Sequence, residues 1–454
     1  MDLSRISAFF GVNSSGKTSL IQTLLLMKQT TASSDRRQVL NLGDDGTPLV
    51  LGLRDALFKQ DVNRELYLEY AWSRPERAQR DSIPLAPPDP VNPERALFEA
   101  TDVSFSTSLS VTNNQLQVED LEYRASPANV SISRVRGGRQ RRIAEYRLAA
   151  SVNGDGNYLT RVPGRVWQLP PPVKCYGFPD EVFAYYKNSE FVSELELDLE
   201  RQFSERLFYL GPLRQVPRRR YSWQGSTPSD VGVAGERAIE ALLVSSSRPH
   251  PRTNTRAFNK IGRAIRRITV EEHVAAWLAE LDLLDKFDVE PIAEGLDIYR
   301  VMVQRHAGSS PVSLADVGFG VSQVLPVLVL LAYVPEGATV VLEQPELHLH
   351  PAVQAGLADI IIETSSVRRV QVIVESHSEH LLRRLQRRVA ERKVHAEDVA
   401  LYFCEYQQGE SRLDRLDLNL LGEISNWPAG FFGDPLGESV AMVNARRAFP
   451  AREI

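Results

Sequence analysis

The chain has 454 residues, of which 43% are hydrophobic and 24% are charged, as in a globular rather than a disordered protein. This length exceeds the roughly 250 to 300 residues that one core supports, so two or three structural units are expected. A formal net charge of −5 excludes a polycation that binds nucleic acid through its overall charge. Arginines nevertheless cluster at 134–142, 218–220, 252–267 and 383–392, either as solvated faces or as a DNA-facing groove.

The longest apolar run, at 324–334, is shorter than the about 20 residues that span a bilayer, and the N-terminus has no signal-peptide pattern. We therefore predict a cytoplasmic protein without membrane contact. Cys175 and Cys404 are too few for a disulfide framework and have no metal-ligand spacing. Both are predicted to be buried.

The first predicted elements are a short apolar strand at 6–10 and a helix at 17–27. Between them, residues 11–18 read Gly-Val-Asn-Ser-Ser-Gly-Lys-Thr. This sequence fits the phosphate-binding pattern G-x-x-x-x-G-K-[ST], the P-loop, in its strand–loop–helix context. Glycines let backbone N–H groups point at phosphate oxygens, and the helix N-terminus adds a favourable dipole. Lys17 would reach the β- and γ-phosphates of ATP, and the Thr18 hydroxyl would bind Mg²⁺. The predicted site comprises Gly11, Asn13, Ser14, Ser15, Gly16, Lys17, Thr18 and Ser19.

From about residue 62 the pattern alternates as in strands, at 66–70, 103–111, 116–123 and 146–152. We predict an antiparallel β insertion here, with a Pro-rich loop at 84–93 and a hairpin turn at 153–156. Between about 234 and 286 the period becomes helical, which predicts a helical lid or arm.

A Gly/Ser turn at 313–326 then enters an apolar helix, and an apolar strand is predicted at 339–342. Glu343 follows that strand, at the end where open α/β sheets place their ligands, and would hold Mg²⁺ through water. His348 and His350 lack a third metal ligand at an obvious spacing, so structural hydrogen bonds are favoured for both.

A second apolar strand at 370–374 precedes His377, which is placed to hydrogen-bond a γ-phosphate or an attacking water. The strand–helix–strand order of 339–374 implies a parallel α/β arrangement. The predicted fold class is thus α/β, with a mixed sheet that carries the β insertion and the helical lid.

These four motifs, in this order, resemble the ABC-type AAA ATPases related to the OLD proteins, RecF and the SMC-like heads. The strings at 343–351 and 375–380 especially resemble stand-alone bacterial members found beside nuclease or toxin genes in anti-phage defence. The resemblance covers 1–60 and about 205–435, including Tyr-Leu-Gly-Pro-Leu-Arg at 209–214 and Trp-Pro-Ala-Gly-Phe-Phe at 427–432.

The resemblance implies a homodimer or higher homo-oligomer that encloses ATP, with the turn of Gly318, Gly320 and Ser322 completing the partner's site. Ala315 stands at the usual position of the signature serine, and Ser322 is its substitute. Gln344 occupies the place where many relatives carry a catalytic glutamate, so hydrolysis is expected to be slow unless Glu346 handles the attacking water. Few residues precede Ile6, where the family has a strand hairpin, so either the first lobe is trimmed or the start is late.

We expect four segments: 1–61 with the P-loop, 62–204 as the β insertion, 205–310 with the helical lid, and 311–454 with the remaining motifs. Residues 400–454 lack the acidic metal-binding arrangement of a fused nuclease domain, so an effector, a nuclease or toxin, would be encoded separately. The leading hypothesis is an ATP-dependent dimerising switch for that effector. The alternatives are a RecF-like repair ATPase that binds duplex DNA and a nearly non-hydrolytic scaffold.

Overall fold

The computed structural model of the chain separates into two units by its internal contacts. Unit 1 comprises residues 1–21 and 208–454, and unit 2 comprises residues 22–207. The expected loops at 84–93 and 153–156 lie largely outside the described residues. Those residues are 1–43, 47–74, 83–84, 97–98, 100–135, 145–152, 154, 156, 158–164, 168–247, 255–258, 264–293, 296–428, 431–432 and 440–444.

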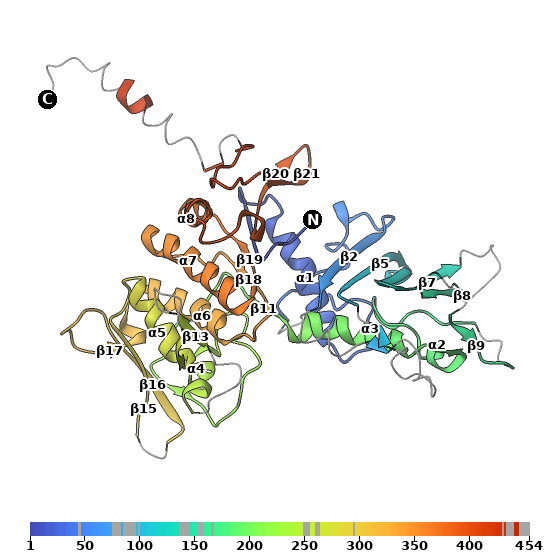
Figure 1. The fold of residues 1–454 in the computed structure, drawn as a ribbon, viewed down its shortest axis with the longest axis horizontal. Coiled ribbons are helices and arrows are strands. Elements are labelled where there is room, and N and C mark those ends of the chain that lie inside the picture. The colour runs from blue at the N-terminus through green and yellow to red at the C-terminus, as the bar shows by residue number, and fades with distance from the viewer. Residues whose placement is uncertain are drawn as a thin grey trace. The chain divides into compact units, whose positions relative to one another are not determined.

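A six-stranded mixed sheet forms the centre of unit 1, as the α/β prediction required. Strands β18, β19, β1 and β20 are parallel neighbours, and β21 pairs antiparallel with β20. Figure 1 shows how segments from both ends of the sequence meet in this sheet. In order, the strands are β11 (Leu207–Leu210), β18 (Thr339–Glu343), β19 (Gln371–Glu375), β1 (Ile6–Gly11), β20 (Val399–Gln407) and β21 (Glu410–Leu416).

Helix α7 (Pro351–Arg368) connects β18 to β19, and α8 (Glu379–Ala390) follows β19, so the predicted strand–helix–strand order is confirmed. His350 caps α7 by accepting a hydrogen bond from Ala352 N at 3.3 Å, which is the structural role expected for that histidine. Helix α6 (Phe319–Tyr333) follows the short 3₁₀ turn η6 (Leu314–Asp316), as the Gly/Ser turn predicted. Another 3₁₀ turn, η7 (Ala396–Asp398), precedes β20.

The region expected to form a helical lid or arm contains α4 (Ala238–Ser247) and α5 (Val270–Glu280). Leu242 of α4 and Trp277 of α5 are buried in the same core cluster as β18 and α6. Both helices therefore belong to the packed body of unit 1. The neighbouring strands are β12 (Tyr221–Ser222), β13 (Thr255–Phe258), β14 (Ala264–Ile268), β15 (Lys286–Pro291), β16 (Ile298–Gln304) and β17 (Val312–Ser313).

Unit 2 contains a five-stranded antiparallel sheet, in the order β2 (Leu66–Ser73), β5 (Asp102–Thr112), β6 (Gln115–Ala125), β7 (Ala128–Val135) and β8 (Glu145–Val152). Strand β7 was not predicted. Most of α1 (Lys17–Ala32) also belongs to this unit, because the division falls after Ile21. The remaining elements are η1 (Phe58–Gln60), β3 (Ile83–Pro84), β4 (Leu97–Phe98), β9 (Thr160–Arg161), α2 (Asp180–Tyr185), β10 (Tyr186–Lys187), α3 (Glu190–Glu200) and the π-helical turn η4 (Arg201–Glu205).

Both cysteines are buried, as predicted. In the described part of the chain, no helix has the length and apolarity needed to cross a bilayer.

Candidate functional site

The loop between β1 and α1 follows a path that only glycine permits at two positions. Gly11 has a φ of 144°, and a Cβ atom there would lie 2.2 Å from the carbonyl oxygen of Cys404. Gly16 has a φ of 92°, and its Cβ atom would lie 2.6 Å from Oγ of Ser411. A side chain at either position would push the loop away from β20 and β21, so the two glycines fix its curvature.

Lys17 begins α1 and folds back over this loop. Its side chain is buried, and its ammonium group donates hydrogen bonds to the carbonyl oxygens of Gly11 at 3.2 Å and Val12 at 2.8 Å. Burial lowers the pKa of Lys17, and the negative charge of Glu375 opposes that shift. A cation is thus held inside the curve of the loop, where a phosphate would meet it.

A buried hydroxyl group in the loop also suits the binding of a nucleoside triphosphate. Oγ of Ser15 is buried and has no hydrogen-bond partner in the described part of the chain. A buried hydroxyl without a partner costs free energy that a ligand oxygen could offset. Asn13, Ser14 and Ser19 are exposed and accessible to a ligand.

The carboxyl ends of three parallel strands meet beside the loop. Glu375 ends β19 and pairs in register with Phe9 of β1 on one side and with Glu343 of β18 on the other. The Thr18 hydroxyl donates to the Glu375 carboxylate, at 3.0 Å from Oε2 and 3.2 Å from Oε1. Burial raises the pKa of Glu375, whereas the Thr18 hydrogen bond and the Lys17 charge lower it.

Glu343 is buried at the end of β18 and has one neighbour from β11, Tyr209, and one from the segment after that strand, Arg214. The Tyr209 hydroxyl donates to its Oε1 at 3.1 Å, and Arg214 donates from Nη2 to its backbone carbonyl at 3.2 Å. Burial, followed by the charge of Glu375, raises the pKa of Glu343 to about 7. Burial also lowers the pKa of Arg214 to about 10, so this guanidinium keeps its charge at neutral pH.

Gln344, Glu346 and His377 lie on the turns that follow β18 and β19. Gln344 has a φ of 43°, and its N–H donates to the carbonyl oxygen of Glu375 at 2.8 Å. Glu346 is buried and accepts the backbone N–H of His377 at 2.6 Å. Burial, followed by the charge of Lys17, lowers the pKa of His377, which keeps its imidazole neutral at pH 7.

The turn of Gly318, Gly320 and Ser322, called here the signature-like turn, lies against the turn after β18. Gly318 is exposed at the N-cap of α6, and a Cβ atom on Gly320 would lie 3.5 Å from the carbonyl oxygen of His348. Ser322 is buried within the first turns of α6, with 5% exposure.

The structure therefore gathers Lys17, Thr18, Glu343, Glu346 and His377 at one edge of the sheet. Three of their neighbours were given no role in the sequence analysis: Glu375, Tyr209 and Arg214. Each stands inside a string quoted there, but their proximity depends on strand pairing between segments far apart in the chain.

The residues present fit Mg²⁺ only together with a nucleotide. Among the described residues, no group of three His, Cys, Asp or Glu side chains is arranged to hold a metal ion. Thr18 and Glu343 supply hard oxygen atoms, and Mg²⁺ is usually held by one or two carboxylates together with substrate phosphates. This donor set suits a cation that arrives with ATP.

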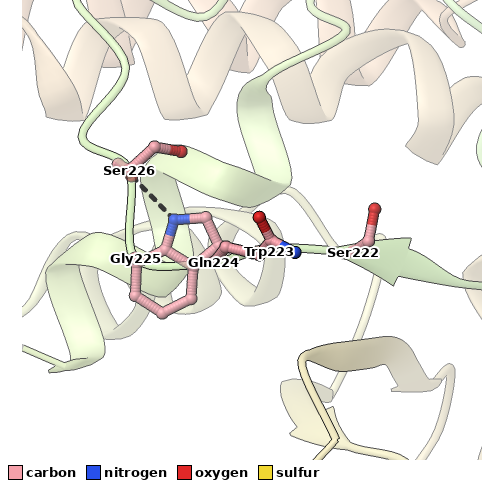
Figure 2. A pocket seen from close by; sticks show the side chains of 5 residues that line it. All are labelled: Ser222, Trp223, Gln224, Gly225 and Ser226. Atoms are coloured by element: carbon pink, nitrogen blue, oxygen red, sulfur yellow. Dashed lines mark hydrogen bonds between the residues drawn. The ribbon is translucent and has the colours of Figure 1, made fainter.

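A surface pocket lies elsewhere in unit 1, in the loop after β12 (Figure 2). It is lined by the consecutive residues 222–226, and Trp223 Nε1 donates to the Ser226 carbonyl oxygen at 2.7 Å across it. Because one short loop provides the whole lining, no group from another element converges on it, and we assign it no function.

Two parts of the chain match known protein families. Residues 229–383 match the family described as "AAA domain, putative AbiEii toxin, Type IV TA system", and residues 394–440 match "Protein of unknown function (DUF3696)". The first match includes α6, β18 and β19 but not the P-loop. No curated protein matches the chain.

Among solved structures, a SMC head bound to the C-winged helix domain of ScpA has 11% identity and a TM-score of 0.41, with 92% of each chain covered. The SMC head with an extended coiled coil from Pyrococcus furiosus has 10% identity and a TM-score of 0.40, with 98% of this chain and 94% of that chain covered. The SMC head domain from Thermotoga maritima has 10% identity and a TM-score of 0.33, with 92% of each chain covered. The family match identifies an AAA-type ATPase domain in the chain.

Proposed function

We propose that the protein binds ATP with Mg²⁺ at the carboxyl edge of the unit 1 sheet and hydrolyses it slowly. ATP binding would drive dimerisation and so control a separately encoded effector in anti-phage defence. One observation carries the nucleotide site: Thr18 of the P-loop donates to Glu375 at the end of β19, and the charge of Lys17 interacts with the same carboxylate. Glu343 ends the neighbouring parallel strand β18 in register with Glu375.

Each residue of the site has a distinct task in this proposal. The Lys17 ammonium opposes the charge of the triphosphate, while Thr18 and Glu343 hold Mg²⁺, which supplies charge neutralisation at the phosphates. His377, neutral at pH 7, donates a hydrogen bond to the terminal phosphate or to the attacking water. Gln344 orients that water, because an amide cannot take its proton.

Dimerisation on ATP rests on the resemblance and on the exposure of the two surfaces involved. Asn13 and Ser14 of the loop are exposed, and so is Gly318 at the start of α6. The N-terminus of a helix attracts phosphate, so α6 of a second copy would complete the site. The matched family's description names a toxin–antitoxin system, which supports a functional partner encoded as a separate chain.

Substitution of Lys17 tests the nucleotide site. Lys17→Ala should lower ATP affinity in calorimetry by about 100-fold or more, because charge-assisted hydrogen bonds to the phosphates are lost. Lys393→Ala changes an exposed lysine that pairs with Glu391, and should leave the affinity unchanged. Unchanged ATP affinity in a folded Lys17→Ala protein would remove the site assignment.

The switch is tested by the mass of the protein, measured with and without Mg-ATP after purification from its native operon. A shift to the dimer mass or above with Mg-ATP, together with a co-purifying product of a neighbouring gene, is expected. A monomer mass at saturating Mg-ATP would contradict dimerisation. Neighbouring recombination genes, in place of a toxin or nuclease gene, would favour the DNA-repair alternative.

A further inference from the structure

Glu375 is a third buried carboxylate beside the P-loop, and the proposed function gives it no task. Its exposure is 2%. A charged carboxylate at such depth costs free energy unless hydrogen bonds or an opposite charge offset the loss of solvent. Here the Thr18 hydroxyl and the charge of Lys17 provide that offset, and both belong to the P-loop.

The strand register fixes this position more firmly than a surface contact would. Glu375 lies on the strand between β1 and β18, directly opposite both Phe9 and Glu343. Two backbone hydrogen bonds also fix the end of β19. The carbonyl oxygen of Glu375 accepts the N–H of Gln344, and the N–H of Ser376 donates to the carbonyl oxygen of Phe9 at 3.0 Å. The carboxylate is therefore held at the centre of the sheet edge, in contact with Thr18.

The direction of the Thr18 hydrogen bond matters for a metal. By donating its proton to Glu375, the hydroxyl leaves its oxygen lone pairs free for a cation. Partners of this kind orient a metal ligand and raise its basicity, and their loss typically lowers metal affinity by about 10- to 100-fold. Glu375 also adds a negative charge beside Glu343, which attracts a divalent cation but repels phosphates that arrive without one.

We propose that Glu375 is a positioning residue of the magnesium site, which orients Thr18 towards Mg²⁺ and makes nucleotide binding depend on the cation. This inference rests on the proposed ATP site. It predicts opposite effects on two measurable affinities, because the same charge favours Mg-ATP and disfavours free ATP.

The test compares ATP affinity in calorimetry with excess Mg²⁺ and with EDTA. In Glu375→Gln, the ATP affinity should fall in the presence of Mg²⁺ and rise in the presence of EDTA. The ratio of the affinity with Mg²⁺ to that with EDTA should therefore decrease by about tenfold or more. A purely structural role would weaken both arms by the same factor. Glu397→Gln is the matched control, because Glu397 is exposed at the opposite, amino edge of the same sheet, and it should keep the wild-type ratio.

Glu375→Asp provides a second variant if Glu375→Gln does not fold. The shorter side chain keeps the charge but loses its reach to Thr18, so weak binding in EDTA should persist while part of the gain from Mg²⁺ is lost. An unchanged ratio in a folded variant, or an equal loss in both arms, would overturn the role of Glu375. If the wild-type protein bound no ATP in either arm, the proposed function itself would fail.

Discussion

Gln344 occupies the position next to Glu343 where a carboxylate could accept a proton from an attacking water. Its left-handed backbone, with φ of 43°, is held by the hydrogen bond from its N–H to Glu375. A non-glycine residue in this region costs free energy, and such strain is concentrated at functional sites. The next carboxylate along the chain after Gln344 is that of Glu346, which already accepts the His377 N–H and thereby holds the turn after β19.

These contacts predict different outcomes for two substitutions. Gln344→Glu should raise basal ATP turnover, since general-base assistance typically contributes about 10²- to 10⁴-fold, and should shorten the lifetime of the ATP-bound dimer. Glu346→Gln should change turnover little, because an amide oxygen also accepts the His377 N–H. Steady-state phosphate release from both variants decides the matter. No change in the first variant with loss of hydrolysis in the second would identify Glu346 as the base.

Much of this site could be predicted because local sequence determines it. The P-loop pattern needs glycine at positions 11 and 16, and the structure shows that a Cβ atom at either would collide with β20 or β21. Glu343 and His377 follow apolar strands, so their place at the carboxyl edge follows from strand direction alone. The role of Glu375 was not predicted, because its contact with Thr18 joins residues 357 positions apart and depends on the pairing of β1 with β19.

Helix α6 carries the signature-like turn at one end and depends on Arg368 at the other. Arg368 lies at the end of α7 with 4% exposure, and its guanidinium donates to the carbonyl oxygens of Leu331 and Val334. The last carbonyls of a helix lack partners within it and carry partial negative charge, so a buried cation satisfies both needs. Burial lowers the pKa of Arg368 to about 10, which leaves it charged at neutral pH.

Removing this cap should therefore destabilise unit 1. Arg368→Met should lower the free energy of unfolding by about 2 to 4 kcal/mol, because two buried carbonyl groups lose a charged donor. Arg387→Met is the control: Arg387 is largely exposed on α8 and pairs with Glu391, so its loss should cost at most about 0.5 kcal/mol. Urea denaturation of both variants tests this, and equal effects would show that the cap contributes nothing specific.

Elements with strong apolar periodicity were predicted well, and weaker patterns were not. Strands β18 and β19 are continuous apolar runs because both faces of the sheet are covered. Strand β7, ANVSISRV, was missed because its alternation of buried Ala128, Val130 and Ile132 with polar residues is short. The helices α4 and α5 were predicted as helical, but their burial against α6 depends on tertiary packing that periodicity does not reveal.

At the scale of the whole molecule, the arginine clusters differ in how far their charge is neutralised. On α8, Arg384 and Arg388 pair with Asp359. Arg383 pairs with an acidic residue of the same helix, and Arg387 with Glu391 directly after it. This cluster is an ion-paired face, in line with the solvated alternative. Side chains at 252–267 and most of the cluster at 134–142 lie outside the described residues.

The cluster at 218–220 offers exposed cations. Arg218 and Arg220 are exposed, whereas Arg219 is held by Asp316, with contacts of 2.6 and 3.0 Å to its two carboxylate oxygens. Arg218 and Arg220 would therefore supply about two phosphate contacts in the DNA-binding alternative. Such contacts release condensed counterions, so they make affinity depend on salt.

If duplex DNA is a ligand, the slope of log affinity against log salt should be about −0.9 for each phosphate contact. Replacing Arg218 and Arg220 together by Gln should then reduce the magnitude of that slope by about 2, because each arginine accounts for about one contact. Arg387→Gln should leave the slope unchanged, since its charge is already paired with Glu391. Fluorescence anisotropy with a duplex of about 30 base pairs, between about 50 and 200 mM salt, measures all three slopes. Absence of binding at the lowest salt, or a wild-type slope near zero, would show that this loop is a solvated surface. The hypothesis of a DNA-binding repair ATPase would then be rejected in favour of the effector-controlling switch.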